Sequence, residues 1–176
     1  MGNSKNTSSE YAVFPQWYVL YVRSRAEKKV RDRLEKNSID VFLPLIKVVR
    51  QWSDRRKQVQ VPLFNGYLFL FIDPGQFSFV KMIEGVVGFV KQEHKNATIS
   101  EEEISTIRKF LETGIHIETE NDTFLPGEKV KINFGPLKGY TGELIEIKNE
   151  KQFIVRLSVI HQVLKLSVPV HYLQKV

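Results

Sequence analysis

Alternation of side chains along two nearly continuous apolar segments dominates the pattern of this chain. Residues 17–22 (WYVLYV) and 67–72 (YLFLFI) each predict a β-strand. Successive strand residues point to opposite faces, so each strand has two distinct sides. We expect helices to cover the aliphatic side. The other side then needs a cover of its own, which is either the rest of the chain or a partner protein. In the second strand the two sides are Leu68, Leu70 and Ile72 against Tyr67, Phe69 and Phe71.

Helical periodicity and capping patterns predict two main helices around these strands. Ser24 and Glu27 have the spacing of a capping box before a helix over residues 25–37. Ser100 and Glu103 repeat that spacing before a second helix, which ends near Gly114. Further segments complete an α+β fold, an antiparallel sheet with helices on one face. They are a hairpin over 40–50 and 56–61, a short helix over 76–82 and a strand over 85–90.

A change of pattern near residue 115 predicts a second domain. Residues 115–123 are polar and acidic and are interpreted as a linker. From residue 124 to 176, some five short alternating segments separated by turn residues indicate a small antiparallel β-barrel. The first domain spans residues 15–114, and residues 1–14 are expected to form a disordered tail.

Composition narrows the possible functions. The chain has 176 residues, 42% hydrophobic and 26% charged, which is typical of a globular protein. It has no cysteine, which excludes disulfides and thiolate metal sites. No segment has the length of a membrane span or the form of a secretory signal, so we expect a cytoplasmic protein without membrane contact.

Candidate catalytic chemistry is sparse. His116, Glu118 and Glu120 alternate and could share a face toward a metal, but in this acidic segment we interpret them as solvated surface. The glycine-rich segment 135–142 lacks the Gly-Lys-Ser/Thr ending of a phosphate loop and is interpreted as a turn. We therefore expect neither enzymatic activity nor a cofactor or metal.

Positive charge is concentrated in the first domain. The net charge is +6, and residues 1–113 hold 18 basic and 13 acidic side chains. One cluster lies between Arg23 and Lys36, and a second surrounds Trp52 at the expected hairpin tip. Basic side chains bind phosphates and an exposed indole stacks on unpaired bases, so both clusters indicate single-stranded nucleic acid. A solvated helix face with internal Glu–Lys pairs is the alternative for the first cluster.

Several segments resemble the NusG family of transcription factors. Residues 17–21, 62–69 and 85–90 are similar to its N-terminal (NGN) domain, a ferredoxin-like fold. Residues 124–130 and 135–142 resemble its KOW domain, an SH3-like barrel. Within the family, residues 21–30 and 50–55 are similar to the specialised UpxY paralogs, which resemble RfaH in acting on operons for capsular or surface polysaccharides.

The resemblance implies a transcription elongation and antitermination factor. Its N-terminal domain would dock on the clamp helices of RNA polymerase and contact non-template single-stranded DNA. Matching positions for polymerase are Tyr21, Phe64, Tyr67 and Phe69, and for DNA they are Arg23, Arg25 and Lys28. Charge and stacking, rather than the resemblance, add Trp52, Arg55 and Arg56 to the nucleic-acid site.

One departure from the family affects the second domain. Ile160 and His161 stand where general NusG proteins carry Phe-Gly in the loop that binds partners. This substitution weakens the expectation of binding both to the termination factor Rho and to ribosomal protein NusE. Of the two, NusE is kept as a candidate partner of the KOW domain. We expect a monomer. The alternative hypothesis is an RNA- or ribosome-binding KOW module that does not dock on polymerase.

Overall fold

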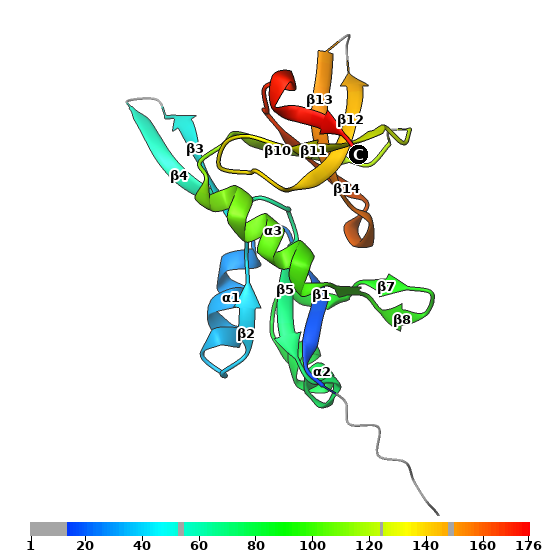
Figure 1. Cartoon of the computed structure of the whole chain (residues 1–176). Coiled ribbons are helices and arrows are strands. Elements are labelled where there is room, and N and C mark those ends of the chain that lie inside the picture. The colour runs from blue at the N-terminus through cyan, green and yellow to red at the C-terminus, as the bar shows by residue number, and fades with distance from the viewer. Residues whose placement is uncertain (1–13, 53–54, 124, 148–149) are drawn as a thin grey trace, which may run out of the picture.

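The computed structural model describes residues 14–52, 55–123, 125–147 and 150–176 (Figure 1). The expected N-terminal tail up to residue 13, the hairpin tip at 53–54, residue 124 and the turn at 148–149 lie outside these residues. Across the described ranges, no helix combines the length and the apolar character needed to span a bilayer.

An antiparallel sheet with strands of different lengths forms the N-terminal part. Strands β1 (Gln16–Val22) and β5 (Tyr67–Ile72) pair at its centre, with β2 (Asp40–Phe42) beside β5 and β6 (Val86–Phe89) beside β1. The short strand β9 (Thr98–Ile99) also pairs with β1. Both central strands are rich in aromatic and β-branched residues, which favour extended backbone.

The register confirms the predicted alternation of faces. Tyr21 lies opposite Tyr67, and Val19 lies opposite Phe69. On the aliphatic face, Leu20 and Leu68 are fully buried with Val30 of helix α1 (Glu27–Glu35). Helix α2 (Phe77–Met82), which follows the 3₁₀ turn η1 (Pro74–Gln76), packs on the same face.

Helix α3 (Glu101–Glu112) corrects the expectation that helices cover one face only. Its buried side chains share a core with Trp17, Val19 and Phe69, which point away from α1 and α2. The guanidinium carbon of Arg108 lies 5.4 Å from the Trp17 ring centroid and 5.0 Å from that of Phe42, which is a cation–π arrangement. An amphipathic helix therefore covers much of the aromatic face.

The start of α3 follows the predicted capping box. Ser100 Oγ accepts a hydrogen bond from the Glu103 amide at 3.2 Å, and the Glu103 carboxylate accepts one from the Ser100 amide at 3.0 Å. Carboxylates at positions 101–103 also face the positive end of the helix dipole. The buried stripe that follows is Ile104, Ile107 and Phe110.

Two hairpins leave the N-terminal sheet at opposite edges (Figure 1). Strands β3 (Leu45–Gln51) and β4 (Arg56–Pro62) form the long hairpin that was predicted, directly after edge strand β2. Strands β7 (Lys91–Gln92) and β8 (Lys95–Asn96) form a short one after the other edge strand, β6.

The C-terminal part is the expected all-β domain. In its sheet the order is β10-β14-β13-β12-β11-β15, and all described pairs are antiparallel. The 3₁₀ turns η2 (Ser158–Ile160) and η3 (Val170–Tyr172) precede β14 and β15. The strands are β10 (Ile117–Asn121), β11 (Glu128–Ile132), β12 (Thr141–Ile147), β13 (Glu150–Leu157), β14 (Gln162–Leu166) and β15 (Leu173–Lys175).

Strand β10 shows that the linker interpretation of residues 115–123 is wrong for most of that segment. It pairs with β14 along its whole length, and Lys165 of β14 bridges the carboxylates of Glu118 and Glu120 at 3.1 and 2.9 Å. The acidic residues that gave this segment the composition of a linker are therefore paired with a lysine more than forty residues later in the chain.

Helix α3 also contacts the C-terminal domain. The Phe110 ring meets Tyr140 at 5.2 Å in an edge-on arrangement, and Thr119 Oγ1 donates a hydrogen bond to the Leu63 carbonyl at 3.2 Å. One apolar cluster consequently runs from the N-terminal sheet through α3 into the C-terminal strands. The α+β class with an all-β second domain is confirmed.

Candidate partner-binding surfaces

Two tyrosines remain accessible at the end of the aromatic face that α3 does not cover. Tyr21 is 43% exposed and Tyr67 is half-buried, and their ring centroids lie 5.3 Å apart at 52°. Gly88 lies opposite Tyr21 on β6, so the residue paired with Tyr21 on that side has no side chain. We call Tyr21 and Tyr67 the tyrosine pair.

Gly66 and Glu27 fix the backbone beneath the tyrosine pair. Gly66 has φ +82°, and a Cβ there would lie 2.9 Å from Tyr21 Cε2, so glycine is required on both conformational and steric grounds. Its amide donates a hydrogen bond to Glu27 Oε1 at 2.9 Å, and its carbonyl accepts one from Val22 at 2.8 Å. The loop before β5 is therefore held to both β1 and α1.

Glu27 corrects the first predicted capping box. The helix begins after Ala26, which makes no side-chain capping bond, and Glu27 is 4% exposed. A buried carboxylate requires hydrogen-bond partners, and the amide of Gly66 supplies one. The sequence pattern identifies Glu27 as a residue that accepts a backbone hydrogen bond. It does not identify the donor, because Gly66 lies 39 residues away.

The surroundings of Tyr67 keep its phenol neutral. Burial raises the pKa of Tyr67 above its ordinary value of 10.0, and the neighbouring Tyr21 raises it further. The tyrosine pair thus presents two aromatic rings with hydroxyl groups, which is the kind of amphipathic anchor found at protein interfaces.

Phe64 and Phe69 do not share this accessibility. Both are fully buried, and their rings pack edge to face at 6.0 Å. Of the two covers considered for the aromatic face, the chain itself supplies the one over Phe69, which packs in the same core as α3. In this arrangement the two phenylalanines support the tyrosine pair from within the core.

The structure links the two basic clusters that the sequence indicated. Lys28 Nζ of α1 donates a hydrogen bond to the Gln60 carbonyl of β4 at 2.7 Å. Along β4, Arg56 lies four residues nearer the tip, roughly 13 Å at about 3.3 Å per residue. Trp52 is 54% exposed, and its amide bonds to the carbonyl of Arg55 at 2.8 Å.

Cross-strand pairing places two positive charges of this hairpin next to each other. Arg50 and Lys57 lie directly opposite each other in the ladder, and both are exposed. Like charges in that relation destabilise a hairpin unless a counter-ion approaches. The Arg56 guanidinium bonds to Gln51 at 3.2 Å, which orients it without neutralising its charge.

The helical cluster is partly neutralised within the chain. Arg31 pairs with Asp32 at 2.7 Å, and Arg33 pairs with Glu84 at 2.6 Å, as the alternative of internal ion pairs expects. Arg23 and Arg25 are exposed at the start of α1, and no ion pair is formed by either among the described residues. Arg25 also has φ +65°, an uncommon conformation for a non-glycine residue.

The two residues expected to bind partners in the second domain differ in accessibility. Ile160 is 4% exposed and belongs to the cluster shared with α3, whereas His161 is exposed with φ +52°. A partner could therefore reach His161 but not the Ile160 side chain in this arrangement. His116, once considered as a metal ligand, bonds instead to Glu118 at 3.1 Å.

Comparisons with known proteins agree with this two-part architecture. Residues 15–108 match the family profile described as "Transcription termination factor nusG". The chain is 28% identical over 147 residues to a transcription termination/antitermination protein NusG of Rickettsia felis, with 77% of each chain covered. It is 27% identical over 167 residues to the NusG of Buchnera aphidicola, covering 88% of this chain and 91% of that relative.

A solved structure supports the fold. The chain resembles the structure titled "Domain interaction in Thermotoga maritima NusG" with a TM-score of 0.52 and 22% identity, covering 92% of this chain and 97% of that one. The matching family profile and the curated relatives define a transcription factor with this fold. The chain belongs to the NusG family of transcription termination and antitermination factors.

Proposed function

We propose that this protein is an antitermination factor that docks on the clamp helices of RNA polymerase through the tyrosine pair. The observation that supports the proposal is a pair of neighbouring tyrosine rings left accessible on a sheet face whose central residues are covered by α3. Aromatic anchors of this kind contribute most of the affinity at many interfaces. Membership of the NusG family gives the partner class.

The second part of the proposal concerns DNA. Arg23, Arg25 and Lys28 contact the phosphates of the non-template strand, and the β3–β4 hairpin extends this contact with Trp52, Arg55 and Arg56. The bond from Lys28 to Gln60 supports one continuous surface, and the Arg50–Lys57 repulsion supports an anionic partner. Bridging polymerase and DNA opposes pausing and release without any chemical step. The similarity to UpxY proteins suggests polysaccharide operons as targets.

A binding experiment with matched variants tests the docking step. Full-length Tyr21→Ser/Tyr67→Ser should bind core RNA polymerase at least about tenfold more weakly than the wild type, because both anchors are lost. Leu125→Ser is the control, since Leu125 is 85% exposed and lies in the other domain. Equal affinities for the wild type and the tyrosine double variant, with thermal unfolding unchanged, would overturn the docking site.

The DNA contact has its own test. Arg23→Gln/Arg25→Gln/Lys28→Gln should lower the slope of log affinity against log salt for a single-stranded oligonucleotide by about 0.7 per lost phosphate contact. An unchanged slope would contradict this assignment. If the variant bound DNA normally while the intact C-terminal domain bound RNA or ribosomes, the alternative of an RNA- or ribosome-binding module would replace the proposal.

A further inference from the structure

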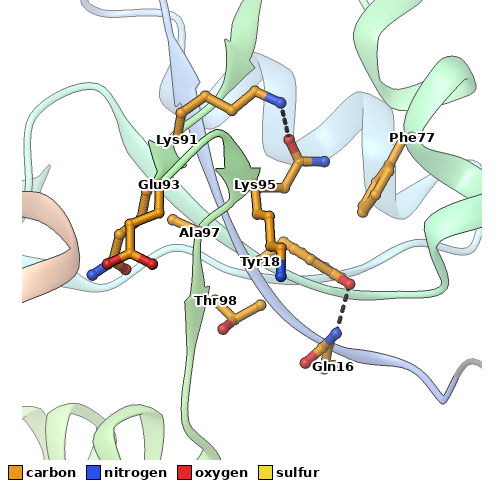
Figure 2. Close-up of a pocket in the computed structure, with 10 residues that line it drawn as sticks. Gln16, Tyr18, Phe77, Lys91, Glu93, Lys95, Ala97 and Thr98 are labelled. Atoms are coloured by element: carbon orange, nitrogen blue, oxygen red, sulfur yellow. Dashed lines mark hydrogen bonds between the residues drawn. The ribbon is translucent and has the colours of Figure 1, made fainter.

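A second hairpin, on the other edge of the N-terminal sheet, borders an open cavity that is lined by aromatic, amide and lysine residues. The β7–β8 hairpin, β1 and Phe77 of α2 border a space of about 540 Å³ (Figure 2). This is within the range of roughly 300–1,000 Å³ that is usual for small-molecule sites. The cavity lies away from the tyrosine pair and from the β3–β4 hairpin, and none of its lining residues has a role in the proposed function.

Two aromatic rings border the cavity. The rings of Tyr18 and Phe77 meet edge to face at 4.8 Å, and Phe77 also packs against Phe89 at 4.8 Å. The Tyr18 side chain is buried, and its hydroxyl oxygen accepts a hydrogen bond from Gln16 Nε2 at 2.7 Å. The hydroxyl proton is thus still available for a ligand. Phe77 is only half-buried, so its ring can stack on a flat group.

The hairpin adds positive charge and amide groups. Lys91 and Lys95 line the cavity together with the side chains of Gln92 and Asn96. Lys91 Nζ donates to Asn96 Oδ1 at 2.6 Å, which orients the ammonium and leaves two of its hydrogens available. Glu93 is the acidic residue of the lining, and Figure 2 shows it directed away from Phe77.

The backbone holds these groups in place. Glu93 and His94 form the turn with φ +49° and +68°, the left-handed values that a tight two-residue hairpin needs and that glycine usually supplies. The hairpin base continues the sheet through the bonds from Val90 to Val19 and from Ala97 to Val90, at 2.9 and 2.8 Å. The backbone that carries the lysines is therefore tied to the sheet, so little backbone conformational entropy is lost when a ligand binds.

We infer that this cavity binds one nucleotide unit of a single-stranded nucleic acid. Phe77 stacks on the base, Lys91 and Lys95 contact the phosphates, and the amides of Gln16 and Gln92 face the base edges. An acidic peptide would satisfy the lysines but would offer no flat ring to Phe77 and few partners to the amides. The chain would then contact a strand at two separate hairpins, one on each edge of the sheet.

Titration of the ¹⁵N-labelled full chain with the pentanucleotides dT5 and rU5, followed by NMR, tests this inference. We expect saturable shifts of the amides of residues 92–98. Lys91→Gln/Lys95→Gln should weaken the affinity measured at Asn96 at least about fivefold and reduce the salt slope by about 1.4, for two phosphates. Lys131→Gln/Lys138→Gln, on exposed lysines of the C-terminal domain, should leave both unchanged.

A test of the stacking contact needs a conservative substitution of Phe77, because Phe77 also packs against the core. Phe77→Leu keeps apolar contact with Tyr18 and removes the ring, so affinity should fall about tenfold, as for a lost base stack. Thermal unfolding of this variant checks that the fold is intact. Comparison of dT5 with rU5 identifies which strand is preferred.

Several outcomes would overturn the site. These are the absence of shifts at residues 92–98, equal affinity of the lysine double variant, and tighter binding of a glutamate-rich peptide than of either pentanucleotide. Binding of free UMP as tight as that of rU5 would show a nucleotide pocket rather than a strand contact. Loss of polymerase docking in the tyrosine variants would not change these results, so the two proposals can fail separately.

Discussion

The middle and one end of the aromatic sheet face differ in accessibility. In the middle, Phe69 lies in the core shared with α3 and has no exposed surface. At one end, two strand positions away on the same face, Tyr67 and its neighbour Tyr21 are left accessible. Residues of the same aromatic character thus belong to the core in the middle of the face and form a surface at its end. The helix that lies on the face makes the difference, and the strand sequence alone does not.

The largest expected contrast is in stability. Phe69→Ala should reduce the free energy of unfolding by about 3–5 kcal/mol, because it opens a cavity in a closed core. Tyr21→Ala should cost about 1 kcal/mol or less, since much of that side chain is already in water. Urea denaturation of both variants measures the difference. Equal losses of unfolding free energy in the two variants would mean that Phe69 and Tyr21 are buried to the same extent.

Gly66, which lies directly beneath the tyrosine pair, offers a sharper test of that end. Gly66→Ala forces a β-carbon to within 2.9 Å of the Tyr21 ring and requires a left-handed backbone, so we expect a loss of about 2–3 kcal/mol. The Tyr21 ring must also move, which nuclear Overhauser contacts between Tyr21 and Tyr67 would report. Gly114→Ala is the control, because Gly114 also has a left-handed backbone (φ +66°) but a Cβ there meets nothing within 4 Å.

Glu27 tests whether the loop beneath the tyrosine pair depends on one hydrogen bond. Glu27→Ala leaves the Gly66 amide buried without its acceptor, which should destabilise the fold by roughly 1–3 kcal/mol. Glu27→Gln keeps an acceptor and should lose less. Hydrogen exchange at the Gly66 amide, expected to accelerate in the alanine variant only, measures the effect locally. Unchanged protection in both variants would rule out this anchoring role.

The smallest effect concerns ionisation of the tyrosine pair. The folded-state pKa of Tyr67 is raised above its unfolded value of 10.0, so the stability that this group contributes is complete below pH 10 and is lost as the pH rises through the folded pKa. Tyr21→Phe removes the neighbouring phenol and should lower the pKa of Tyr67 toward 10.0, although burial keeps it above that value. Ultraviolet absorbance titration of the phenolate reports the shift, and an upward shift would contradict the assigned cause.

Local patterns in the sequence predicted what is local in the structure. The alternation in residues 17–22 and 67–72 determined both faces of the central strands, because a strand fixes the side of each residue by position alone. The capping box at Ser100 was also correct, since its partners lie three residues apart. The accessible tyrosines followed from the same alternation together with the family resemblance.

Contacts between distant residues account for what the sequence did not predict. The face that α3 would cover depends on where Arg108 meets Trp17 and Phe42, and no local pattern encodes that choice. Glu27 was assigned to a cap because the spacing fits, but a distant amide competes successfully for the carboxylate. The β10 strand was not predicted because the lysine that pairs with its acidic residues, Lys165, is distant in the sequence.

Sandwiching α3 between two sheets has a consequence for how the polypeptide melts. Its apolar stripe is completed by side chains from both halves, so the core around α3 is incomplete in either half once the other is removed. Cleavage of the chain by a protease after Glu112, followed by separation of the fragments, would expose apolar side chains of this shared core on each fragment. Heating of the intact chain should therefore give a single calorimetric transition for both halves.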